Sequence, residues 1–439
     1  MDNSQQQGRW QIPFFTIWSG QALSLIGSKV AQFALVWWLT KLTGSATVLA
    51  TASMVALIPE IVLGPIAGVY VDRWNRRVVM IVSDTLIALA SLWLAYLFWT
   101  DAMQVWHVYV IMFVRAVGGS FHWPAMQAST SLMVPKKHLT RVAGLNQTMN
   151  GALNIVAPPV GALLLAVMPL YSIMLLDVGS ALLAIGPLCV VHIPQPRRED
   201  LGSHKTRRPS VLADMRQGLR YIWNWPGLLA LIGSVMIIKV ALTPAFSLLP
   251  LLVSKYFGGD AAQLSLLESV VGVGIVVGGL ILSVWGGFRR RIYTTLMGST
   301  ILGLGLVGLG LTPGHLFWAA LASVFVVGLM IPLVDGPIMA ILQDTVVPEM
   351  QGRVFTIMGS LLSLTSPFSL AVAGPVSDWL GLQVWYVVAG VLCVALGLSG
   401  FFVPVIANIE ENHRGRAIPD KGMVPVAAET AATEKVPAP

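Results

Sequence analysis

The sequence predicts an all-α membrane protein with twelve transmembrane helices in two similar six-helix bundles. Three observations support this prediction. Of the 439 residues, 56% are hydrophobic and only 11% are charged, whereas soluble domains carry about 25% charged residues. The apolar residues gather in runs that reach the length of about 20 residues needed to cross a bilayer. The basic residues lie between these runs, as in the loops of membrane proteins.

The apolar runs define the expected elements. Six of them fall in the first half of the chain, at 13–39, 46–71, 78–99, 105–132, 142–168 and 170–192. The other six fall at 226–253, 262–286, 292–311, 315–342, 354–377 and 382–406. We therefore expect bundles at 1–192 and 226–406, a basic linker at 193–225 and a disordered tail at 407–439. Residues 211–223 of the linker have the pattern of an amphipathic helix at the membrane surface.

The basic residues are distributed unequally between the two sides of the predicted membrane. Loops on one side carry two arginine clusters, the basic linker, two further single arginines and two lysines, whereas those on the other side carry only Lys41 and Lys255. Positive loops remain in the cytoplasm, so both termini are predicted to be cytoplasmic. The net charge of +7 therefore indicates membrane topology and anionic lipid contact rather than a nucleic-acid partner.

The two halves are weak copies of each other. Trp38-Leu-Thr-Lys41 aligns with Leu252-Val-Ser-Lys255, and Arg76-Arg77 aligns with Arg290-Arg291, both at an offset of 214 residues. Such repeats are typical of secondary transporters, in which the substrate site lies between the repeats near the bilayer midplane. A duplication without a present mechanical role is the alternative.

A charged turn between the second and third runs has a recognisable spacing. Gly68-x3-Asp72-Arg73-x2-Arg76-Arg77 resembles the signature turn of the major facilitator superfamily. Residues 12–22, 38–46, 121–125 and 352–355 are similar to segments of bacterial macrolide-efflux proteins. The resemblance implies a drug:proton antiporter of the bacterial inner membrane, exporting amphipathic compounds such as macrolides. Related transporters carry siderophores or lysophospholipids, so export of an endogenous metabolite is the alternative.

The resemblance also implies a role for this turn. Asp72 is expected to meet the positive N-terminal end of the eleventh helix and to hold the outward-facing state. Asn75 stands where the family usually has Gly, and it is expected to tolerate a left-handed backbone. The residues of this turn are interpreted either as a conformational latch or as topology signals. They are Gly68, Asp72, Arg73, Arg76 and Arg77, and Asp84 is expected to join the same network.

Ionisable residues inside the predicted helices are costly and therefore indicate function. Glu60 and Arg115 are predicted at a similar depth, with Lys29 within reach, so Glu60 is the leading candidate for carrying the proton. A permanent ion pair of Glu60 with Arg115 or Lys29 is the alternative. Asp177, near the outer end of its span, and Asp335, between two prolines of a broken helix, are the further candidates for proton coupling.

Other residues are predicted to line the substrate cavity. Glu268 is expected to face the first half across the cleft, and the remaining candidates are Lys29, Lys239, His122 and Trp123. For His122, a packing role is the favoured alternative. Pro158 and Gly161 match a motif of antiporters only in part, and they indicate either an antiport-specific kink or simple packing.

Several classes of function have no support in the sequence. It lacks the G-x-x-x-x-G-K-[ST] pattern of ATP-driven pumps. It also lacks a metal-ligand cluster and a catalytic triad, so we expect a monomeric transporter, not an enzyme, with neither cofactor nor metal.

Overall fold

The computed structural model describes residues 10–191, 193–194 and 211–410. Side chains are not described at positions 65, 69, 72, 136, 211–215, 348 and 349. Residues 195–210 of the predicted linker, residues 411–439 of the predicted tail and the side chain of Asp72 therefore lie outside the described part.

The described chain is helical throughout. The first half contains α2 (Gln11–Thr43), α3 (Ala46–Arg73), α4 (Arg76–Trp99), α5 (Val105–Met133), α6 (Leu139–Val167) and α7 (Leu170–Val190), with the short η1 (Lys136–His138) between α5 and α6. The second contains α9 (Pro226–Ser247), α11 (Ala261–Trp285), α12 (Arg291–Leu311), α13 (Phe317–Thr345), α14 (Pro348–Leu380) and α15 (Leu382–Phe402). Shorter helices are α8 (Val211–Trp223), α10 (Leu249–Leu251), η3 (Leu252–Tyr256) and α16 (Pro404–Ala407).

These twelve long helices confirm the predicted fold class. Within the described residues, eleven helices are long and apolar enough to cross a membrane, and α5 is the long helix not among them. The polar residues His107, Arg115 and His122 of α5 lower its hydropathy. The predicted seventh span differs in one respect, because α9 ends at Ser247 and the chain continues through α10 and η3. Pro250 lacks the N–H that a continuous helix would need at this point.

Side-chain caps fix where several helices begin. The hydroxyl of Ser45 accepts a hydrogen bond from the Val48 amide at the start of α3, and Asp260 accepts one from the Gln263 amide at the start of α11. Asn75 caps α4 by accepting from the amides of Arg77 and Val78. Its φ is −69°, so the expectation of a left-handed backbone is wrong: the Asn side chain serves here as an N-cap.

Small residues allow the helices within each bundle to approach closely. Gly303 on α12 and Gly390 on α15 face each other, and a Cβ at either position would lie within 2.6 Å of the other glycine's carbonyl oxygen. Gly161 on α6 lies against Phe33 on α2, where a Cβ would be 2.7 Å from the ring. Such contacts are typical of helix packing in membranes, where van der Waals fit replaces the hydrophobic effect.

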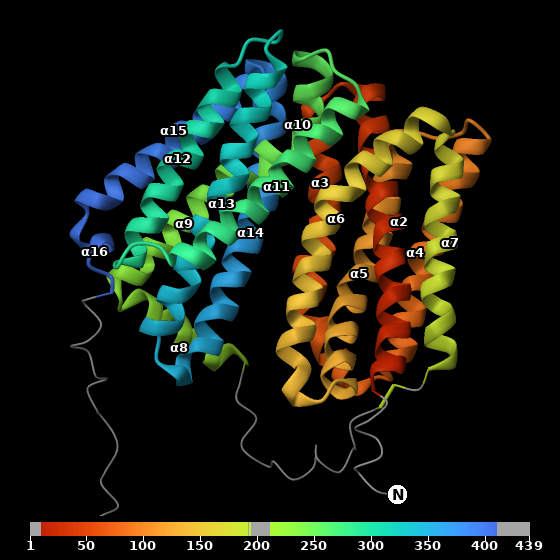
Figure 1. Ribbon diagram of the computed structural model, residues 1–439, viewed down its shortest axis with the longest axis horizontal. Helices are drawn as coiled ribbons and strands as arrows, with labels where there is room; N and C mark the ends of the chain where they lie inside the picture. The colour runs from red at the N-terminus through yellow and green to blue at the C-terminus, as the bar shows by residue number, and fades with distance from the viewer. Residues whose placement is uncertain (1–9, 192, 195–210, 411–439) are drawn as a thin grey trace, which may run out of the picture.

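The two bundles meet at one end of the molecule and separate toward the other (Figure 1). We call the end with α8 and the α3–α4 turn the basic end. At the opposite end α3 packs against α14, and a Cβ on Gly374 would lie 2.8 Å from the Cα of Thr47. Toward the basic end the corresponding glycines have open space: no atom lies within 4 Å of a Cβ built at Gly64, Gly68, Gly144, Gly151, Gly279, Gly352 or Gly359.

Candidate functional site

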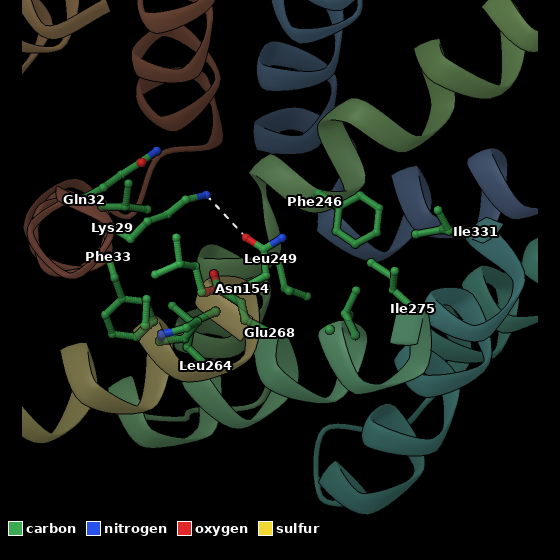
Figure 2. Close-up of a pocket in the computed structure, with 16 residues that line it drawn as sticks. Lys29, Gln32, Phe33, Asn154, Phe246, Leu249, Leu264, Glu268, Ile275 and Ile331 are labelled. Atoms are coloured by element: carbon green, nitrogen blue, oxygen red, sulfur yellow. Dashed lines mark hydrogen bonds between the residues drawn. The ribbon is translucent and has the colours of Figure 1, made fainter. Parts of the chain in front are cut away.

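A cavity of about 410 Å³ lies between the two bundles. Figure 2 shows its lining, with Lys29 and Phe33 on one side, Ile275 and Ile331 on the other, and Asn154 and Glu268 between them. Its described lining is mostly apolar, and Lys29 from α2 and Glu268 from α11 are the charged side chains in it. Glu268 thus lines the cavity together with residues of the first half, and its predicted role in substrate binding stays a prediction.

Contacts between α6 and α11 fix the position of Glu268. The hydroxyl of Ser269 donates to the carbonyl oxygen of Ile155 at 2.8 Å. Gly272 lies against the same residue, since a Cβ there would be 2.8 Å from the Ile155 side chain. These contacts hold the helical turn of α11 that carries Glu268 at the wall of the cavity.

Lys29 is held from the other side of the cavity. Its Nζ donates to the side-chain oxygen of Asn154 on α6 at 3.4 Å (Figure 2). Pro158, one turn further along α6, also lines the cavity, and α6 continues as a helix through Pro158 and Pro159. Sequence reasoning did not single out Asn154, although an amide in the middle of an apolar span is a signal that could have identified it.

A second cavity, of about 500 Å³, lies against the inner face of the first bundle. Its lining includes six of the predicted residues, which are Lys29, Glu60, Asp84, Arg115, His122 and Trp123. Lys29 and Gln32 line both cavities. Glu60 and Trp123 are exposed to this space. Glu60 has no hydrogen bond or ion pair with any described residue.

Arg115 forms its ion pair with Asp177, not with Glu60. Nη1 of Arg115 lies 2.5 Å from Oδ2 of Asp177, whose side chain is 1% exposed. The hydroxyls of Ser28 and Ser91 donate to the same carboxylate at 2.9 and 2.7 Å. Asp177, which is predicted near the outer end of its span, is therefore enclosed by residues of four helices and does not reach water.

Asp84 belongs to a second buried cluster. Its carboxylate accepts a hydrogen bond from Nε2 of Gln21 at 2.9 Å and lies 3.2 Å from Nε2 of His122. The histidine contact has the distance of an ion pair without the alignment of a hydrogen bond. Asp84 lies more than two helical turns into α4. At a rise of 1.5 Å per residue, this places it ~12 Å from the α3–α4 turn. Its described partners are thus interior residues rather than the turn network expected from sequence.

Lys239 and Asp335 lie elsewhere in the second bundle. Both line a smaller cavity of about 130 Å³ between α9 and α13, and they form no ion pair with each other. The prediction of a broken helix around Asp335 is wrong, since α13 runs unbroken through Pro332 and Pro337. The structure therefore does not bring Asp335 together with Glu60, Arg115 or Asp177.

The arginines of the α3–α4 turn contact the ends of neighbouring helices in their own bundle. Arg76, which is buried, donates to the carbonyl oxygen of Ala128 on α5 at 2.8 Å, and Arg77 donates to that of Cys189 on α7. In the second bundle, Arg291 donates to Ala340 on α13 at 3.4 Å. Gly68 faces open space and Arg73 is exposed.

At the opposite end, one carboxylate joins the two bundles. Asp378 on α14 accepts hydrogen bonds from the amides of Ala46 and Thr47 at 2.7 and 2.9 Å, and from the Ser45 hydroxyl at 2.9 Å. It therefore occupies the N-terminus of α3, where the helix dipole favours a negative charge. Sequence reasoning missed this contact, because nothing in the sequence pairs residues more than 300 positions apart at this end.

Comparison with known proteins agrees with this architecture. The family model of the Major Facilitator Superfamily matches residues 17–252 and 240–428. The chain belongs to the major facilitator superfamily and is a multi-pass membrane transporter. It is 34% identical over 395 residues to macrolide efflux protein A of Streptococcus pyogenes, covering 90% of this chain and 96% of that protein.

More distant relatives share the fold. The chain is 27% identical over 402 residues to the multidrug efflux pump Tap of Mycolicibacterium fortuitum, covering 88% of this chain and 94% of the relative. The solved structure of a bacterial homologue of the human lysosomal transporter Spinster superposes with a TM-score of 0.66 at 12% identity. That superposition covers 93% of this chain and 98% of the other.

Proposed function

We propose that this protein is a secondary active exporter of amphipathic small molecules of the macrolide type, driven by proton antiport. The observation that carries the proposal is the mostly apolar cavity between the two bundles, which faces Lys29 and Glu268. Its volume of about 410 Å³ falls within the range of cavities that hold drug-sized ligands. The macrolide and multidrug efflux functions of the relatives support the same substrate class.

We further propose that the protein lies in a bacterial cytoplasmic membrane with the basic end in the cytoplasm. The asymmetry of arginine and lysine supports this orientation, which places both termini in the cytoplasm. The open glycine positions near the basic end then correspond to an inward-facing state. The halves 1–192 and 226–406 act as the two moving bodies of one monomer, because one chain forms the whole cavity, and the exposed Arg73 lies toward anionic lipid.

Glu60 remains the proposed carrier of the proton. Its carboxylate is exposed to the cavity of the first bundle without a described partner, so its protonation does not require breaking an ion pair. The Arg115–Asp177 pair, which is neutral as a whole, lies in the same bundle, and Arg115 is its member that lines this cavity. In the outward-facing state, proposed movement of α3 changes the distance from Glu60 to these charges and to Lys29, and with it the affinity of Glu60 for a proton.

Proteoliposomes test both parts of the proposal. With the purified full chain, addition of a macrolide is expected to drive proton movement that a pH-sensitive dye records. Glu60→Gln should abolish this proton movement while the macrolide still binds. Unchanged proton coupling in the variant would remove Glu60 from the mechanism. In cells, macrolide accumulation that does not respond to a protonophore would argue against proton-driven export.

A further inference from the structure

We infer that Glu268 binds the single positively charged amine of the exported compound, and that Lys29 opposite it excludes compounds with a second positive charge. This inference rests on the proposed export function and specifies the charge of its substrates.

Glu268 is a carboxylate on an apolar helix face that has no salt bridge with a described residue. Leu264, Val271 and Ile275 line the same cavity from the same face of α11, at the spacing of successive helical turns. Among the described residues, no hydrogen bond or salt bridge reaches Glu268, and the charge that acts on its carboxylate is that of Lys29 across the cavity. A charge inside a transmembrane helix costs about 2.5–3.5 kcal/mol on insertion scales. Lys29 offsets this cost only from across the cavity, so the carboxylate oxygens of Glu268 keep their capacity to accept hydrogen bonds from a charged ligand.

The charge balance of the cavity limits what this ligand can be. Among the described residues that line it, Lys29 and Glu268 are the charged ones, so the empty cavity has a formal charge of zero. Hydrogen bonding of Lys29 to Asn154 at 3.4 Å holds its ammonium group toward α6, and no ion pair joins it to Glu268. One substrate amine can therefore pair with Glu268, whereas a second amine would meet the ammonium group of Lys29 in a medium of low dielectric constant.

The carboxylates of the other cavity are less suited to this role. Asp177 is paired with Arg115 and two hydroxyls, and Asp84 is bonded to Gln21 and close to His122. Glu60 is unpaired but belongs to the first bundle only. Glu268 is thus the unpaired acid that faces both bundles, where a bound compound contacts the two halves together.

Binding of matched compounds to the purified full chain tests this inference. The probes are a macrolide with one tertiary dimethylamine, an analogue in which an acyl group replaces one N-methyl group and gives a neutral amide, and an analogue with two amines. The variants are Glu268→Gln and Lys29→Gln. Asp344→Asn is the control, because it makes the same charge change in the second bundle on an exposed side chain outside the cavity.

The wild type is expected to bind the monoamine about tenfold more tightly than the neutral analogue. Glu268→Gln should remove this difference while affinity for the neutral analogue stays within about twofold, which also shows that the variant is folded. Lys29→Gln should raise affinity for the diamine about tenfold, and Asp344→Asn should change neither preference.

The inference is overturned if Glu268→Gln keeps the preference for the monoamine, or if it loses affinity for the monoamine and for the neutral analogue equally. If Glu268→Gln does not fold, an unchanged diamine affinity in Lys29→Gln overturns it. Export of the neutral and charged compounds alike by wild-type cells would contradict the inference alone, whereas export of none of them would contradict the proposed function itself.

Discussion

Single residues inside the first bundle are paired in a way that depth along the helix does not reveal. Hydropathy places Arg115 and Glu60 at similar depths, and this made them plausible partners. The structure instead turns Arg115 toward Asp177, which also receives hydrogen bonds from Ser28 and Ser91. The rotation of each helix about its axis decides the pairing, and packing against neighbours sets this rotation.

Removal of one partner from this pair should be strongly destabilising. Asp177→Asn leaves the guanidinium of Arg115 without a counter-charge inside the bundle, which costs about 3–5 kcal/mol. Thermal unfolding in detergent, with Arg115→Met/Asp177→Asn as a double variant, measures this cost. The double variant should recover part of the lost stability. A single variant as stable as the wild type would show that the pair is not an enclosed network.

The exposed pair Arg291–Asp344 provides the matched comparison. Its side chains are 42% and 70% exposed, and exposed pairs contribute about 0.2–1 kcal/mol. Asp344→Asn is therefore expected to change the unfolding temperature little under the same conditions.

At the scale of the helices, hydropathy and charge predicted the twelve spans, their order and the duplicated basic turns. Several ionisable residues singled out from the sequence, among them Lys29, Glu60 and Glu268, line the cavities, whereas Asn154 and the apolar lining residues were not identified. The sequence did not predict the break after Ser247, the unbroken α13 or the contact of Asp378 with α3. These features depend on the hydrogen bonding of the local backbone and on contacts between segments that are far apart in the sequence. The hydrophobic pattern of a single sequence contains neither.

The contact of α6 with α2 should not tolerate a larger residue at Gly161. A Cβ there would lie 2.7 Å from the Phe33 ring, so Gly161→Val should push the two helices apart and reduce macrolide export several-fold. Adding Phe33→Ala should restore part of the export, because it removes the obstructing ring. Gly186→Val on α7 is the control, since nothing lies within 4 Å of a Cβ at that position. Equal effects at both glycines would contradict this interpretation of the packing.

At the scale of the whole molecule, the two bundles are joined at the end opposite the basic one. Asp378 binds the N-terminus of α3, and Nζ of Lys41 on α2 lies 3.4 Å from the carbonyl oxygen of Gly259 in the second bundle. Toward the basic end the interface helices have open space. In a transporter whose halves rock about a central site, these features belong to one of the two end states.

Weakening the Asp378 contact should favour the other end state. Asp378→Asn keeps the shape but removes the charge at the helix N-terminus, an interaction worth about 0.3–1 kcal/mol. Cysteines introduced at cavity residues should then react a few-fold faster with a labelling reagent that is added on the side opposite the basic end. Asp260→Asn is the control, because Asp260 caps α11 within its own bundle at the same end. An equal change in both variants would assign the effect to helix capping alone.

Alternation of the two ends is the central claim, and spin-label distances test it most directly. One pair of labels would be placed on exposed residues of the two bundles at the basic end, at Gly144 and Val284, and another at the opposite end, at Leu42 and Trp379. Both native cysteines, Cys189 and Cys393, would be replaced by serine. During turnover with a macrolide and a proton gradient, the distance at the basic end should shorten as the distance at the opposite end lengthens. Distances that stay fixed, or that change in the same direction at both ends, would contradict the account.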